Sequence, residues 1–109
     1  MRKYVIAASA ALMLSTTLSV FAEDPAGDAT KGKEVFEQCS GCHNADSDEK
    51  KMGPGLKGLF QKEKMVNGKK PTYETVLEQV NEGGNGMPGY KELLSDQEKH
   101  DLMAYLKTL

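Results

Sequence analysis

The stretch Cys39-Ser40-Gly41-Cys42-His43 contains both cysteines of this 109-residue chain. Two thiols three positions apart, followed at once by an imidazole, can form thioethers with the two vinyl groups of a haem while the imidazole reaches the iron from the same side. Ser40 and Gly41 give the intervening turn its freedom. The spacing therefore predicts covalent attachment of one haem through Cys39 and Cys42, with His43 as an iron ligand.

A Cys-x-x-Cys pair also occurs in other kinds of protein. A thioredoxin-like redox pair needs an α/β context with strands, and no alternating strand pattern of useful length occurs in this sequence. Structural zinc needs four ligands, and His100, the second of the two histidines, falls on the polar side of the last predicted helix. A disulfide across three residues closes a small loop and constrains the unfolded chain little. A non-haem metal protein or a disulfide protein is the weaker alternative.

Residues 1–22 have the pattern of an export signal. Arg2 and Lys3 give a positive start, an apolar stretch follows, and Val20-Phe21-Ala22 places small residues at the cleavage positions. The stretch is short for a span of about 20 residues and contains several Ser and Thr, so we expect cleavage rather than a permanent membrane span. The sequence predicts a signal peptide over 1–22, one domain over 23–109 and a periplasmic location.

The charge of the chain argues against nucleic acid as a partner. The formal net charge is −2, and it becomes −4 when Arg2 and Lys3 leave with residues 1–22, whereas phosphate binding needs a basic surface. Lysines nevertheless gather between Asn44 and Thr72: Lys50, Lys51, Lys57, Lys62, Lys64, Lys69 and Lys70. This lysine-rich segment either steers an acidic redox partner or keeps a loop soluble, and the sequence leaves both interpretations open.

Helical periodicity predicts an all-α fold with three helices. The predicted N-caps are Asp28, Thr72 and Ser95, and the predicted ends are about Gln38, Gly83-Gly84 and the end of the chain. Ser95 and Glu98 have the spacing of a capping box. Residues 44–71 are rich in Gly, Lys and Pro, which predicts mostly loop with one short helical turn. A loop this long inside a compact domain usually wraps around something or is disordered.

The chain beyond residue 22 is too small to be strongly stabilised by its own core. It has no Trp and few aromatic side chains. A large apolar cofactor at the centre would supply apolar surface that the sequence lacks.

The second axial ligand has several candidates beyond residue 22: Met52, Met65, Met87 and Met103. Met103 borders the apolar stripe of the last helix, where packing is its expected role. Met52 follows His43 too closely for the chain to cross to the far face of the ring. Met87 stands in the glycine-rich segment 83–90, where glycines let the backbone approach a flat ligand and Pro88 stiffens the approach. We predict Met87 as the ligand, with Met65 as the alternative.

These features together resemble the class I cytochrome c family over the whole of residues 23–109. The matching residues are Gly32 and Phe36 on the first helix, Cys39 to His43, Gly53-Pro54-Gly55, Gly86-Met87-Pro88 and Tyr105 on the last helix. The resemblance implies a helical fold wrapped around one covalent haem c, in which the first and last helices cross at Gly32 and Tyr105. It also implies that the Pro54 carbonyl accepts a hydrogen bond from His43. The chain departs from larger members by its short length and its lack of Trp, so their haem-propionate contacts are not carried over.

The resemblance implies a one-electron carrier that works between redox protein partners and is not an enzyme. With His43 and Met87 on the two axial positions, no substrate needs to coordinate the iron. The alternative is a haem-binding subunit or a gas-binding sensor with a labile sixth ligand.

Overall fold

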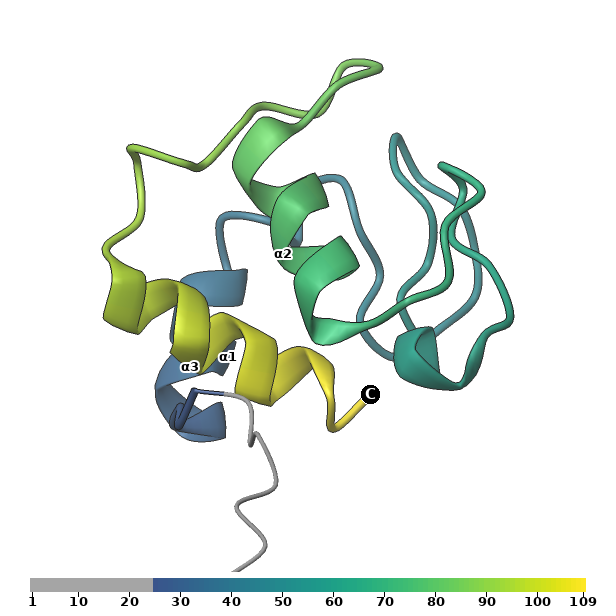
Figure 1. Cartoon of the computed structure of the whole chain (residues 1–109). Helices are drawn as coiled ribbons and strands as arrows, with labels where there is room; N and C mark the ends of the chain where they lie inside the picture. The colour runs from purple at the N-terminus through teal and green to yellow at the C-terminus, as the bar shows by residue number, and fades with distance from the viewer. Residues whose placement is uncertain (1–24) are drawn as a thin grey trace, which may run out of the picture.

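The computed structural model describes residues 25–109, so the predicted signal peptide over 1–22 lies outside the described residues. The helices are α1 (Ala29–Phe36), the 3-10 helix η1 (Leu59–Gln61), α2 (Tyr73–Glu82) and α3 (Asp96–Leu106). Within residues 25–109 the only β pairing is an isolated bridge between Gly84 and Met87, so the all-α prediction is confirmed (Figure 1). No helix in this range is long and apolar enough to cross a membrane.

The three predicted helix starts are confirmed. Each start is stabilised by local hydrogen bonds to the capping side chain, which is why the sequence reveals it. The Asp28 carboxylate accepts from the backbone of Thr30 and Lys31 at the start of α1. Thr72 and Ser95 each form a full capping box with the residue three positions later. The first helix ends at Phe36, slightly before the expected Gln38. Beyond it the backbone forms hydrogen bonds between residues three positions apart, as in a 3-10 turn: Cys39 N donates to Phe36 O at 2.7 Å.

α1 and α3 cross in direct backbone contact, as the resemblance implied (Figure 1). Gly32 lies at the crossing, where a Cβ atom would overlap the carbonyl oxygen of Asp101 and come within 2.8 Å of Tyr105 Cβ. One turn later the rings of Phe36 and Tyr105 pack at 5.4 Å between centroids, tilted by 55°. The glycine thus permits the close approach, and the aromatic pair fills the space beside it.

Replacing Gly32 by Ala should destabilise the protein by about 1–3 kcal/mol, the usual cost of overpacking a filled site. Ala favours an isolated helix by about 1 kcal/mol over Gly, so the expected loss has the opposite sign to helix propensity. Denaturant unfolding of the haem-loaded protein measures the change. Glu34→Ala, on the exposed face of the same helix, is the matched control and should change stability little. A Gly32→Ala protein as stable as the parent would contradict the close crossing.

A buried carboxylate fastens the same two helices together. Asp101 on α3 is 4 % exposed, and its Oδ1 accepts from Asp28 N at 2.8 Å and from Gln97 Nε2 at 2.9 Å. The hydrogen bond from Asp28 N, followed by the one from Gln97, lowers the pKa of Asp101 below its ordinary value, and nearby Lys31 and His100 act in the same direction. The start of α1 is therefore held by an ionised group on α3.

The lowered pKa of Asp101 predicts a pH-dependent contribution to stability. Because the folded value lies below the unfolded one of about 3.9, the contribution is complete above that pH and is lost as pH falls through the folded value. Asp101→Asn should therefore be less stable than the parent near neutral pH, and the difference should shrink in acid. Denaturant unfolding of both proteins across the acidic range tests this, with exposed Glu92→Gln as control. A difference independent of pH would show that charge is not involved.

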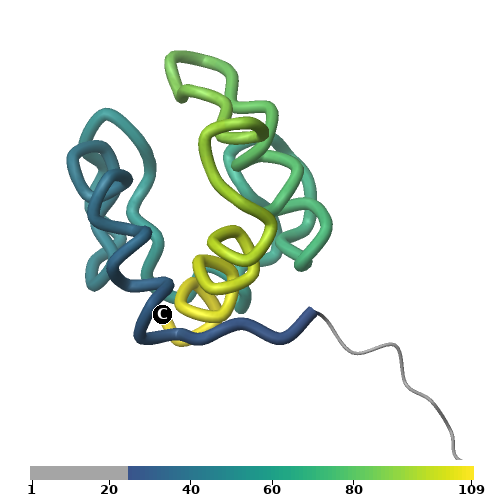
Figure 2. Tube along the Cα trace, turned by 90° about the vertical axis from the view of Figure 1, so that its left-hand side faces the viewer, coloured from purple at the N-terminus to yellow at the C-terminus, as the bar shows by residue number. Residues whose placement is uncertain are grey.

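α3 contributes three buried residues, Leu102, Met103 and Leu106, to the hydrophobic core. The buried apolar side chains are Phe36, Leu59, Val76, Val80, Leu94, Leu102, Met103 and Leu106. Met103 is fully buried, which confirms its expected packing role. Figure 2 shows α1 and the segment after it, in blue, on one side of the molecule and α2, in green, on the other. The candidate site lies between these two sides.

Candidate functional site

The segment after α1 brings the two cysteines and the histidine to the edge of a pocket. Cys42 N and His43 N both donate to Cys39 O, at 3.1 and 3.0 Å, so the chain continues in a tight turn. Cys39 and His43 line the pocket, and both cysteines are half-buried free thiols. The turn therefore presents two unbonded sulfurs next to one imidazole, as covalent attachment of a flat ring requires.

The His43 ring is fixed by its neighbours. Nδ1 lies 2.8 Å from the Pro54 carbonyl oxygen, which can only accept, so Nδ1 is the donor, and in the neutral ring Nε2 keeps its lone pair. Gly53 lies against the ring, where a Cβ atom would come within 2.5 Å of Cε1. Gly53 N also donates to Cys42 O at 2.8 Å. These contacts leave Nε2 available to a metal and restrict the orientation of the ring.

Met87 reaches the pocket from the opposite chain segment, at the end of a two-residue turn. Gly84 and Met87 exchange two backbone hydrogen bonds of 2.9 and 3.0 Å across Asn85 and Gly86. Both of the central residues have positive φ, 52° and 90°, which is the pattern of a type I′ turn. An Asn-Gly pair is the strongest short-range sequence signal for such a turn, so Asn85-Gly86 identifies it from local sequence alone. This turn fixes the backbone from which the methionine extends.

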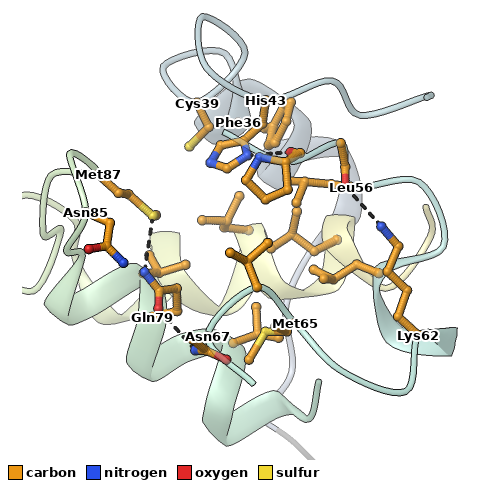
Figure 3. A pocket seen from close by; sticks show the side chains of 18 of the residues that line it. Phe36, Cys39, His43, Leu56, Lys62, Met65, Asn67, Gln79, Asn85 and Met87 are labelled. Carbon is orange, nitrogen blue, oxygen red and sulfur yellow. Dashed lines mark hydrogen bonds between the residues drawn. The ribbon is translucent and has the colours of Figure 1, made fainter. Parts of the chain in front are cut away.

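The Met87 side chain is oriented by a second residue that the sequence analysis missed. Gln79 on α2 places its Nε2 3.6 Å from Met87 Sδ, and its Oε1 accepts from Asn67 Nδ2 at 3.2 Å. Figure 3 shows the Met87 sulfur and the His43 ring both turned toward the pocket. No local pattern identifies Gln79, because its role depends on α2 lying beside the loop that carries Met87.

The pocket collects most of the predicted site residues: Cys39, His43, Pro54 and Met87 all line it, and Cys42 lies one turn from Cys39. Met65 lines it too, so the alternative methionine also belongs to the site. Met52 is 83 % exposed and does not line the pocket. The apolar lining of the pocket includes Phe36, Leu56, Leu59, Val66, Val76, Val80, Leu102 and Leu106. An apolar pocket lined by one imidazole, two thioethers and one thiol, with the second thiol one turn away, fits a haem.

Tyr90, at the end of segment 83–90, lies close enough to the two cysteines to interact with them electrostatically. Burial, and then the proximity of Cys39 and Cys42, raises the pKa of Tyr90. Burial, and then Cys42, likewise raises the pKa of Cys39. The backbone of Tyr90 lies beside α2, because Tyr90 N donates to Val80 O at 2.8 Å, while its hydroxyl lies near the two cysteines.

Two lysines of the lysine-rich segment, Lys62 and Lys64, line the pocket. Lys62 Nζ lies 3.3 Å from an Asp48 carboxylate oxygen and donates to Gly55 O. Lys69 pairs with Glu78 on α2 at 3.1 Å. Two lysines of the segment, Lys62 and Lys69, are therefore paired with carboxylates of the same domain. Steering of an acidic partner by the segment stays a prediction.

The described residues offer little to the rival metal hypothesis. Within residues 25–109 no group of three or more His, Cys, Asp and Glu side chains is placed to hold a metal ion. A zinc site with four such ligands therefore has no ligand set in this part of the chain.

Comparison with known proteins gives a consistent result. A family model described as Cytochrome c matches residues 29–109. Cytochrome c of Chlamydomonas reinhardtii is 35 % identical, covering 83 % of this chain and 96 % of that protein. Cytochrome c6 of Synechocystis is 32 % identical, covering 74 % and 65 %. The solved structure of cytochrome c6 from the diatom Phaeodactylum tricornutum has a TM-score of 0.56 and 29 % identity, covering 75 % and 93 %.

Proposed function

The chain belongs to the cytochrome c family, and from this membership we propose that it is a periplasmic one-electron carrier with His43 and Met87 as axial iron ligands. As a family member it is a haem-containing electron carrier with one covalently attached haem c, held through the Cys39-Cys42-His43 motif. The haem, when bound, supplies the one-electron couple between ferric and ferrous iron. The chain's own residues attach, orient and enclose it.

The observation that carries the ligand assignment is the pair of oriented donors on facing segments. His43 keeps Nε2 free because Nδ1 donates to Pro54 O at 2.8 Å. Met87 is held by the turn before it and by Gln79 beside its sulfur. Met65 lines the same pocket and packs against the hydrophobic core, but within the described residues no hydrogen bond to its sulfur is found. An imidazole opposite a thioether raises the reduction potential and fills both axial positions, which suits a carrier that binds no substrate at the iron.

Absorption spectra of the purified protein in both oxidation states, with a redox titration, test this proposal. We expect low-spin haem in both states, a single one-electron transition and no spectral change when carbon monoxide is added to the ferrous form. Carbon monoxide binding to the native protein would instead support a gas-binding or sensor protein with a labile sixth ligand. A purified protein without covalent haem absorption would contradict the attachment itself.

The periplasmic location is supported by the signal pattern of residues 1–22. N-terminal sequencing of the protein recovered from the periplasmic fraction should begin at Glu23. Recovery of the intact N-terminus in the membrane fraction would show an anchored protein. Redox proteins in the same compartment are the proposed partners, with no permanent membrane span after cleavage.

A further inference from the structure

The chain contains two Asn-Gly pairs on the rim of the pocket, Asn67-Gly68 and Asn85-Gly86. Both asparagines are exposed to solvent. We propose that Asn85 is a site of spontaneous deamidation, while Asn67, with the same following residue, is protected by its hydrogen bonds. The consequence for the iron rests on the proposed function, but the covalent change itself does not.

The reaction needs only the chain and water. The backbone nitrogen of Gly86 attacks the side-chain carbonyl carbon of Asn85, a new C–N bond closes a five-membered succinimide, and the bond to Nδ2 breaks so that ammonia leaves. Water then opens the ring at either carbonyl and gives aspartate or isoaspartate. Glycine favours ring closure because it has no side chain to obstruct the approach. Asparagine is accordingly among the thermolabile residues.

Asn67 is held away from this geometry at three atoms. Its Nδ2 donates to Gln79 Oε1 at 3.2 Å, and its Oδ1 accepts from Lys69 N at 2.9 Å. The nitrogen that would attack, Gly68 N, donates to Met65 O at 2.9 Å. Ring closure at Asn67 therefore requires breaking these hydrogen bonds first.

Asn85 differs from Asn67 at the carboxamide and at the attacking nitrogen, although the two hydrogen bonds between Gly84 and Met87 hold the turn around it and must loosen for the ring to close. Within residues 25–109 no hydrogen-bond partner is found for its carboxamide or for Gly86 N. In Figure 3 the carboxamide lies beside Met87 on the pocket rim, with no interaction drawn to it. The turn that places Met87 thus consists of the two residues whose chemistry can change it.

Conversion would act on Met87 in two ways. A carboxylate would stand two residues before the methionine, on the rim of an apolar pocket, where a negative charge favours the ferric state and lowers the potential. Isoaspartate would also add a methylene group to the main chain. The two-residue turn could then no longer keep the paired hydrogen bonds between Gly84 and Met87. Deamidation therefore converts the carrier irreversibly to a form of lower potential.

The experiment is incubation of the purified haem-loaded protein at physiological temperature and mildly alkaline pH, followed by peptide mass spectrometry and enzymatic isoaspartate labelling. Asn85 should convert about tenfold faster than Asn67 or more, since the hydrogen bonds that restrain Asn67 raise its barrier. In denaturant both sites should convert at comparable rates. Equal rates in the folded protein would overturn the proposal, as would a difference that persists in denaturant.

Variants separate the chemistry from its effect on the iron. Asn85→Gln should abolish conversion at that site, and Gln79→Leu, which removes one restraint on Asn67, should speed conversion there. Asn85→Asp should lower the potential of fresh protein more than Asn67→Asp, the matched charge control. If Met87 is not the ligand, the peptide data still stand and only the turn-dependent difference between these two potentials disappears. A Gln79→Leu protein with unchanged Asn67 conversion would contradict the assigned restraint.

Discussion

A protein in which Cys39 and Cys42 are both replaced by Ser will carry no covalent haem and will not form the native fold. The two thiols are the attachment groups, so their loss removes every covalent link. The apolar pocket between α2 and the attachment turn then lacks the group that fills it, and a chain of this size has little core to compensate. Haem staining after denaturing electrophoresis and circular dichroism measure the two effects.

Ser40→Ala is the control for the double variant, since it changes the same exposed turn without touching a thiol. It should keep covalent haem and native helicity. A double Ser variant that is compact and helical without haem would contradict the claim that the cofactor is central to stability. A double variant that retains haem through denaturation would contradict the attachment site.

Replacing Met87 by Ala should leave haem covalently bound while opening the sixth position of the iron. The change removes the thioether but leaves both cysteines and His43 in place. The weak charge-transfer absorption that sulfur gives to ferric haem should vanish, and carbon monoxide should bind the ferrous form. The reduction potential should drop, because a thioether opposite histidine raises it. Axial ligands change the potential over a range of about 0.8 V among haem proteins, so the effect should be large. Absorption spectra and a redox titration measure all of these.

Met65→Ala is the matched control, because Met65 lines the same pocket with the same kind of side chain. It should produce none of the three changes. If Met65→Ala opens the sixth position and Met87→Ala leaves the spectrum intact, the ligand assignment is wrong, although attachment through Cys39 and Cys42 would be unaffected.

The parts of the fold that could be predicted from the sequence depend on nearby residues. Asp28, Thr72 and Ser95 cap helices through hydrogen bonds to amides two or three positions ahead, so their chemistry is visible in a short window. The expected short helical turn in residues 44–71 is present as η1. The attachment motif is equally local, since five consecutive residues carry it.

The parts that could not be predicted depend on contacts between distant residues. The hydrogen bond from Asp28 N to Asp101 spans 73 positions, and Asp101 lies on a helix with two other acidic residues that the sequence does not distinguish from it. Gln79 is one polar residue among several on α2, and only the packed structure places it beside Met87 Sδ. The type I′ turn is a different case, because the Asn85-Gly86 pair predicts it from local sequence. The neighbouring glycines make the same segment resemble an irregular loop.

The unequal contacts among the helices divide the domain into units of different local stability. α1 and α3 pack on each other extensively, whereas α2 makes few direct contacts with α3 and faces the pocket (Figures 1 and 2). Segments with fewer protein contacts open at lower free energy than the global unfolding, and their amide hydrogens exchange sooner. α2 and the loop bearing Met87 therefore form the unit that opens first. With Met87 as the proposed ligand, the sulfur would leave the iron while the paired helices α1 and α3, and the covalent attachment beside them, stay intact.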